Sequence, residues 1–108
     1  MTRGWFVGDF EPTALSTTVC EAAVKRYKKG DQEEAHFHAI ATELTLVLDG
    51  FACFSGHEVG PGGIVVVEPG EVLLFEAVTD VTTVVVKVPS APTDKHLAEP
   101  TEVGTSED

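Results

Sequence analysis

The sequence predicts an all-β fold, a sandwich or barrel of short strands. Val, Ile and Thr make up 30 of the 108 residues, and these β-branched side chains pack well in strands but lose rotamer freedom in helices. Gly, Pro and Asp interrupt the apolar runs at short intervals, and no stretch has the periodicity of a long helix. The length suits one domain with one hydrophobic core.

Eight strands are predicted from the apolar and β-branched runs between turn residues. In order, they lie near residues 4–7, 19–28, 34–39, 43–48, 51–54, 64–67, 72–76 and 81–88. Glycine, which adopts positive φ at little cost, supports turns such as Gly30-Asp31, Asp49-Gly50 and Pro69-Gly70. We expect a domain over residues 1–98. Residues 99–108 are predicted to be an acidic, flexible tail, because they hold too few apolar groups to offset the entropy cost of ordering.

Charge and composition exclude several classes of protein. The 18 acidic residues outnumber the seven Lys and Arg, for a net charge of −11, which argues against nucleic acid as a partner. No run approaches the roughly 20 apolar residues of a membrane-spanning helix. The N-terminal residues lack a signal or transit pattern, and Cys20 and Cys53 have no disulfide-like spacing, so a cytoplasmic location is expected.

Four of the basic residues lie close together, at Lys25, Arg26, Lys28 and Lys29. Such a run is either a solvated strand end or a rim that faces an anion.

Two histidines and a glutamate form the most informative pattern. His36 and His38 are two residues apart, so in a strand their side chains point to the same face. After a turn near residues 41–42, alternation in the next strand directs Glu43, Thr45 and Val47 inward. Two imidazoles and one carboxylate with open positions suit a divalent metal such as Fe, Mn, Ni or Zn.

The full spacing from Gly30 through His36, His38 and Glu43 to Gly50 resembles the first motif of the cupin superfamily. The resemblance extends from about Trp5 to Pro89 and implies a double-stranded β-helix, the jelly-roll barrel, with a metal inside. In the second motif, Leu73 stands where the family has another histidine. The sequence therefore leaves two possibilities, a three-ligand metal site with an additional open position or a cavity that binds a small ligand without metal.

Several other residues are candidates for the cavity. Leu73, Phe75, Val47 and Ile40 are expected to form an apolar wall, and Glu71 shares the parity of Leu73 and Phe75. Glu34 shares the parity of His36 and His38 and is a candidate acid or base. Tyr27, which alternates with Lys25, is a candidate for polarising a substrate oxygen. Two further histidines have no assigned role, His57 in the loop between the motifs and His96 in the C-terminal extension.

The outward row Leu44, Leu46 and Leu48 needs a cover, for which a homodimer is expected, with Trp5, Phe6 and Phe10 completing the interface. The function predicted from the sequence is that of a metal-dependent small-molecule enzyme, oxygenase-like or isomerase-like. The alternative is a non-catalytic cupin that binds or senses a small ligand.

Overall fold

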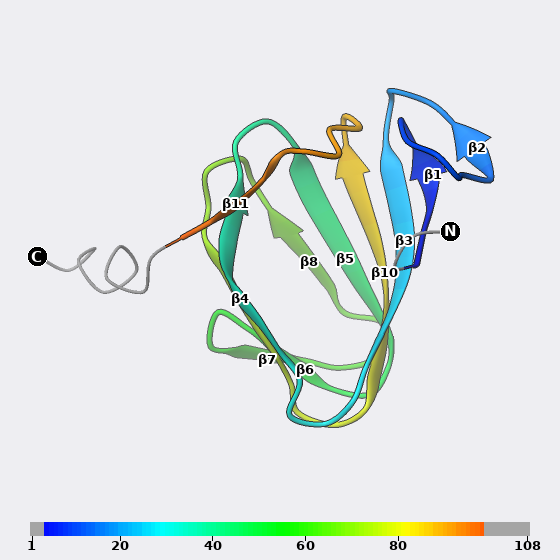
Figure 1. Cartoon of the computed structure of the whole chain (residues 1–108). Coiled ribbons are helices and arrows are strands. Elements are labelled where there is room, and N and C mark those ends of the chain that lie inside the picture. Colours follow the sequence, from blue (N-terminus) through cyan, green and yellow to red (C-terminus); the bar gives the residue numbers. More distant parts are fainter. Residues whose placement is uncertain (1–3, 99–108) are drawn as a thin grey trace, which may run out of the picture.

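The computed structural model describes residues 4–98, which form two facing β-sheets and contain no α-helix (Figure 1). The six-stranded sheet has the order β2 (Leu15–Ser16), β1 (Trp5–Gly8), β3 (Glu21–Tyr27), β10 (Val81–Val88), β5 (Thr42–Asp49) and β8 (Ile64–Val67). The five-stranded sheet has the order β11 (Lys95–Leu97), β4 (Gln32–His38), β9 (Leu73–Ala77), β6 (Ala52–Phe54) and β7 (His57–Val59). The predicted tail at residues 99–108 lies outside the described residues.

All eight predicted strands are present, with ends shifted by at most two residues. The structure adds the short strands β2, β7 and β11, which are too short to show an alternating pattern. His57 therefore lies in a strand that pairs with β6 and not in a loop, and its side chain is exposed.

Strand β5 shows why the two sheets enclose a core. Glu43, Thr45 and Val47 are buried, whereas Leu44 and Leu48 are exposed, which confirms the predicted alternation. Val47 packs with apolar side chains of the opposite sheet, among them Phe54 and Phe75. The core fills one end of the space between the sheets, and the polar inward residues lie toward the other end.

Two turns, one after β5 and one between β4 and β5, have specific structural requirements. Gly50 has a φ of 84° in the turn after β5, where a Cβ atom would collide with the backbone carbonyl of Asp80. In the turn between β4 and β5, the buried Asp94 carboxylate accepts hydrogen bonds from the backbone N–H groups of Ala39, Ile40 and Ala41, at 2.9 to 3.1 Å. This turn joins the strand with His38 to the strand with Glu43. Within residues 4–98, no helix is long and apolar enough to span a membrane.

Candidate metal centre and cavity

His36, His38 and Glu43 converge between the two sheets. His36 and His38 come from β4 and Glu43 from β5, and all three side chains are buried. One possible ligand atom from each lies within 4.8 Å of the others. The two imidazole rings meet edge to face at 5.5 Å between centroids.

Hydrogen bonding orients His36 for coordination. Its Nδ1 lies 2.9 Å from the backbone carbonyl oxygen of Glu34, which can only accept, so Nδ1 carries the proton. In the neutral ring, Nε2 then keeps its lone pair. A histidine ligand oriented by a backbone carbonyl in this way is common in metal sites.

Glu43 is held as a carboxylate by its neighbours. Burial by itself raises the pKa of Glu43, but the hydrogen bond from His38 and the positive potential of His38, His36 and Lys87 outweigh it, so the pKa lies below its ordinary value. His38 Nε2 lies 2.8 Å from Glu43 Oε1, and Thr45 Oγ1 donates to Glu43 Oε2 at 3.4 Å. An anionic carboxylate is the form that binds a metal.

The donor set fits a divalent cation. His38 Nδ1 is buried and has no hydrogen-bond partner in residues 4–98, an arrangement that costs free energy unless a further group satisfies it. Two imidazoles and one carboxylate match the ligand preferences of Fe, Mn, Ni and Zn. In the β4–β9 pairing, Leu73 lies directly opposite His36, so the neighbour of this histidine on the adjacent strand is apolar.

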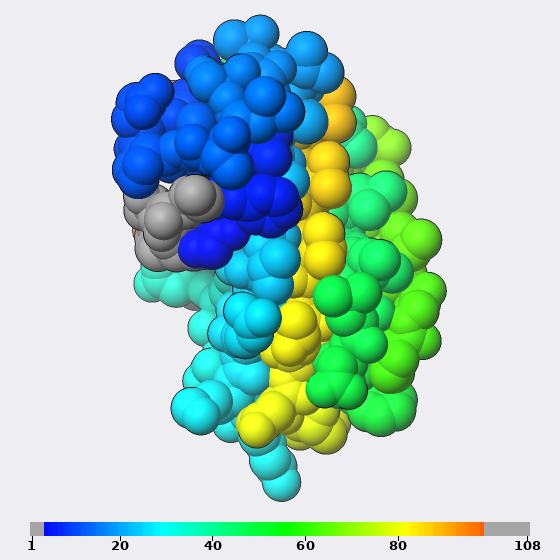
Figure 2. All heavy atoms as spheres, turned by 90° about the vertical axis from the view of Figure 1, so that its right-hand side faces the viewer, coloured from blue at the N-terminus to red at the C-terminus, as the bar shows by residue number. Residues whose placement is uncertain are grey.

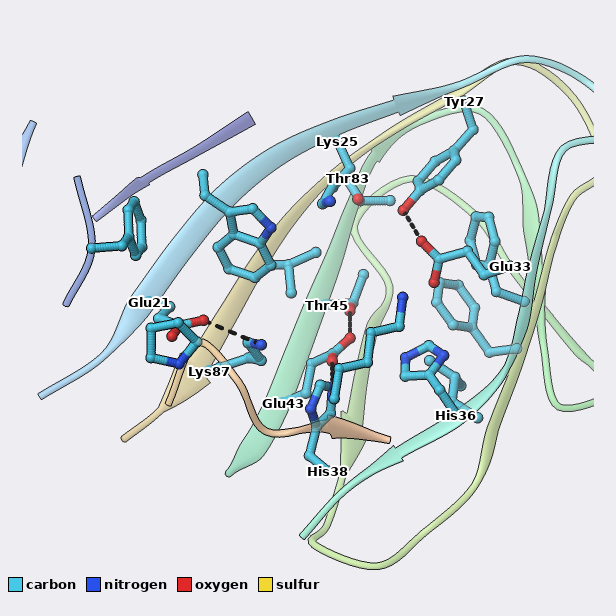
Figure 3. A pocket seen from close by; sticks show the side chains of 18 of the residues that line it. Glu21, Lys25, Tyr27, Glu33, His36, His38, Glu43, Thr45, Thr83 and Lys87 are labelled. Carbon is cyan, nitrogen blue, oxygen red and sulfur yellow. Dashed lines mark hydrogen bonds and ion pairs between the residues drawn. The ribbon is translucent and has the colours of Figure 1, made fainter. Parts of the chain in front are cut away.

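A cavity of about 380 Å³ opens beside this cluster (Figure 3). Its lining combines aromatic and ionisable side chains of both sheets: Trp5, Phe10, Glu11, Glu21, Lys25, Tyr27, Glu33, His36, His38, Glu43, Thr45, Phe54, Leu73, Phe75, Thr83, Val85, Lys87, Pro92 and Lys95. The volume is in the range of small-molecule sites.

Tyr27 and Glu33 face each other across the cavity wall (Figure 3). The Tyr27 hydroxyl donates a 2.7 Å hydrogen bond to Glu33 Oε2, and the Tyr27 ring packs against Phe75 at 4.5 Å between centroids. Burial, followed by the negative charge and hydrogen bond of Glu33, raises the pKa of Tyr27 far above its usual range. Tyr27 is therefore a phenol at neutral pH and is the hydrogen-bond donor of the pair.

The prediction that Glu34 faces the cavity as an acid or base is wrong, because Glu34 is exposed and is not among the lining residues. The register between β4 and β9 shifts between Glu33 and His36. Such an irregularity inserts an extra residue and reverses the alternation before it. Glu33 therefore shares the inward face with His36 and His38. The sequence offered no signal to separate two adjacent glutamates.

Three of the expected lining residues lie elsewhere. Ile40 is 61% exposed in the turn before β5, and Val47 points inward but is enclosed by the apolar core. Glu71 is exposed in the turn before β9, where its carboxylate accepts a 2.6 Å hydrogen bond from the Glu68 N–H. Strand parity failed for Glu71 because β9 begins only at Leu73. Leu73 and Phe75 do line the cavity.

Two aromatic residues expected at a subunit interface also line the cavity. Trp5 and Phe10 reach its edge from β1 and from the segment after it. His96 lies on β11 and stacks on Phe37 at 5.2 Å between ring centroids, outside the cavity lining.

Comparisons with solved structures identify this architecture. An uncharacterised protein with a double-stranded β-helix domain from Klebsiella pneumoniae superposes with a TM-score of 0.70 at 22% identity, over 77% of this chain and 73% of that one. The DMSP lyase DddQ from Ruegeria pomeroyi gives a TM-score of 0.72 at 21% identity, over 87% of this chain and 49% of that one. The bacterial pirin YhhW from Escherichia coli, in complex with nickel(II), gives 0.69 at 12% identity, over 82% and 39%.

The chain has the double-stranded β-helix fold of the cupins. This confirms the fold class predicted from the sequence. No family model matches the sequence, and no curated protein matches it significantly. The chain spans about half of DddQ and less than half of YhhW, so these likenesses establish the cupin fold and leave the activity to be argued from the site.

Proposed function

We propose that this cupin-fold protein is a metal-dependent enzyme that acts on a small molecule inside the barrel. The observation that carries the proposal is the convergence of ligand atoms from His36, His38 and Glu43 within 4.8 Å at the wall of the cavity. The proposed cofactor is Fe, Mn, Ni or Zn, which when bound acts as a Lewis acid on substrate oxygens. Because Leu73 supplies no fourth ligand, more of the coordination sphere is open to substrate.

Tyr27 and Glu33 support proton-transfer chemistry of the isomerase type over oxygen chemistry. Glu33 Oε2 accepts the Tyr27 hydrogen bond, and a carboxylate has further lone pairs with which it can contact a substrate. Glu33 would accept a proton from one substrate atom and return it to another, which balances an isomerisation. Tyr27 would hold the carboxylate in position, and the apolar side chains of Leu73 and Phe75 would limit access of water.

A second candidate function is non-catalytic binding of a small ligand. The observation that favours it is the direct 2.8 Å contact between His38 Nε2 and Glu43 Oε1, which lets the two groups satisfy each other without a cation. Together with Leu73 at the position of a family ligand, this is the arrangement expected of a cupin that has lost its metal.

The cellular location and the oligomeric state are also part of the proposal. We place the protein in the cytoplasm, supported by the free thiols of Cys20 and Cys53. We also propose a homodimer, supported by the exposed apolar side chains of Leu44 and Leu48 on the outer face of β5.

Metal content of protein purified without a histidine tag or chelators tests the enzyme proposal. Plasma mass spectrometry is expected to find about one transition metal ion per chain, and the His36→Ala variant is expected to lose it, because one of three ligands is gone. His57→Ala is the matched control, since His57 is exposed on β7. Protein that stays metal-free after incubation with Fe(II), Mn(II), Ni(II) and Zn(II) would contradict the proposal and favour the binding protein.

Replacement of Leu73 tests the geometry of the centre. Because Leu73 pairs with His36 across β4 and β9, Leu73→His is expected to add a ligand and tighten metal binding by about tenfold or more. Leu73→Asn, which has a similar shape but no imidazole, controls for the new polarity. The measurement is competition with a chelator of known affinity, and equal affinities for the two variants would refute the placement of Leu73 beside the ligands.

A further inference from the structure

Basic residues are over-represented in the cavity lining of this strongly acidic chain. Three of the seven basic residues line it, Lys25, Lys87 and Lys95, but only four of the 18 acidic residues do so, Glu11, Glu21, Glu33 and Glu43. In a chain of net charge −11, basic residues are thus preferentially placed where a ligand would bind. This enrichment makes the three lysines the first candidates for contacts with an anionic ligand.

The three lysines differ in their surroundings. Lys87 Nζ lies 3.2 Å from Glu21 Oε1 in a buried ion pair, and Ser90 Oγ donates to the other oxygen of Glu21 at 3.0 Å. This pair is part of the wall. Lys95 lies on β11 at the edge of the five-stranded sheet and is exposed.

Lys25 lies on the inner face of β3 (Figure 3). Its Nζ is 5.2 Å from the centroid of the Trp5 ring. The structure thereby resolves the basic run of the sequence. Lys25 lines the cavity, whereas Arg26, Lys28 and Lys29 are exposed. Three of the four basic residues are therefore solvated, and one faces the cavity.

Thr83 presents a hydroxyl without a partner next to Lys25. Thr83 pairs with Lys25 across β10 and β3, lines the cavity and is 1% exposed, and its Oγ1 has no hydrogen-bond partner in residues 4–98. A buried hydroxyl without a partner is uncommon, because burial removes its hydrogen bonds to water and no new hydrogen bond replaces them. An ammonium and a hydroxyl on adjacent strands are two donors for one anionic oxygen pair.

The position of Thr83 places this pair within reach of the metal centre. Thr83 pairs with Val47 of β5, so Thr45 is its diagonal neighbour, a separation of roughly 7–8 Å. Thr45 in turn contacts Glu43 through Oγ1. A molecule only a few carbons long can therefore span from Thr83 and Lys25 to the cluster of His36, His38 and Glu43.

We propose that Lys25 and Thr83 form a carboxylate-binding subsite, so that the ligand is a small organic acid with one carboxylate at this pair. The rest of the ligand extends to the His36, His38 and Glu43 centre, and this second part rests on the proposed function. A carboxylate fits better than a phosphate, because the described cavity lining contains no arginine and no helix N-terminus, the groups that usually recognise phosphate.

Calorimetry with defined probes tests the subsite. Succinate and glutarate are titrated into the full chain, once treated with chelator and once loaded with Mn(II), with the uncharged diamides of both acids as controls. Lys25→Met is expected to weaken diacid binding by about tenfold or more, and Thr83→Val by severalfold. Thr83→Ser, which keeps the hydroxyl, is expected to bind like the wild type. Lys28→Met is the charge-matched control, because it removes one positive charge outside the cavity.

The outcomes separate the subsite from the proposed function. Mn(II) binding is measured in the same variants, and Lys25→Met and Thr83→Val should leave it unchanged. Diacid binding that depends on Lys25 in a chain that takes up no metal would support the subsite and refute the metal-dependent enzyme. Metal binding together with equal affinity for diacids and diamides would support the metal centre and refute the carboxylate subsite. Equal losses in Lys25→Met and Lys28→Met would also overturn the subsite, because they would indicate a general charge effect.

Discussion

Tyr27 and Glu33 form the pair on which the proposed proton transfer depends. The hydrogen bond from the Tyr27 hydroxyl to Glu33 Oε2 is 2.7 Å long, and the Tyr27 pKa is raised by burial and by this carboxylate. A phenol with a raised pKa stays protonated at neutral pH, so it donates a hydrogen bond and is not available as a base. The division of roles within the pair therefore follows from its environment.

The ionisation of Tyr27 can be measured directly, because it is the only tyrosine in the chain. We expect phenolate absorbance to appear well above the ordinary tyrosine pKa of about 10. In Glu33→Gln the pKa is expected to fall toward that value, because the negative charge next to the hydroxyl is gone. Glu34→Gln is the adjacent control, since Glu34 is exposed. Equal titration curves for Glu33→Gln and wild type would contradict the pairing.

The raised pKa of Tyr27 also makes the stability of the fold depend on pH. A group whose pKa is higher in the folded than in the unfolded chain stabilises the fold fully below the unfolded pKa, and this contribution is lost as pH rises through the folded pKa. For Tyr27 the window begins near pH 10. Wild-type stability should therefore fall with pH above this value more steeply than that of Tyr27→Phe, in urea unfolding followed by Trp5 fluorescence.

At the level of elements, the turn between β4 and β5 sets the distance between the histidines and Glu43. Asp94, which is far away in the sequence, closes this turn by accepting three backbone hydrogen bonds from Ala39, Ile40 and Ala41. Burial raises the pKa of Asp94, but these hydrogen bonds and the nearby His38 outweigh it, so the pKa lies below its ordinary value.

Replacing Asp94 is expected to loosen this turn. We expect Asp94→Asn to lower the free energy of unfolding at pH 7 by about 2 kcal/mol, because charge-assisted hydrogen bonds to backbone N–H groups are lost. A carboxylate with a depressed folded pKa stabilises above its unfolded pKa of about 3.9, and the contribution disappears as pH falls through the folded pKa. The difference between Asp94→Asn and wild type should therefore shrink below about pH 4.

Urea unfolding at several pH values measures the effect of Asp94. Asp31→Asn is the control, because the exposed Asp31 carboxylate accepts a single backbone hydrogen bond, from Lys28. Its effect should stay within about 0.5 kcal/mol. If the two variants lose equal stability at pH 7, the turn is not held by Asp94.

The sequence predicted elements well where a strand alternates strictly and less well where it does not. Thr45 and Val47 follow the predicted inward face of β5, whose alternation runs without a break. In β4 the shifted register exchanges the expected Glu34 for Glu33, and two neighbouring glutamates give no chemical sign of such a shift. The subsite residue Thr83 was missed for another reason, since a threonine in a β-branched strand looks like any other.

At the scale of the whole molecule, the outer face of the six-stranded sheet is unusually apolar. Figure 2 shows this face, with β3, β10, β5 and β8 side by side. Two cross-strand rows of apolar residues run over it, one formed by Val86, Leu44 and Val66 and the other by Val84, Leu46 and Ile64. Ile64 is 59% and Val66 50% exposed. Continuous apolar surface of this kind is typical of protein interfaces.

The proposed homodimer would cover these rows. Val66→Lys and Leu44→Lys place charges in the centre of the face, and each is expected to raise the dimer dissociation constant by at least about tenfold, because a buried lysine without a partner opposes association. The matched control is Leu74→Lys, since Leu74 is 42% exposed on the other sheet. Size-exclusion chromatography with light scattering over a range of concentrations gives the readout. Wild-type protein that is monomeric at every concentration would show that the homodimer proposal is wrong.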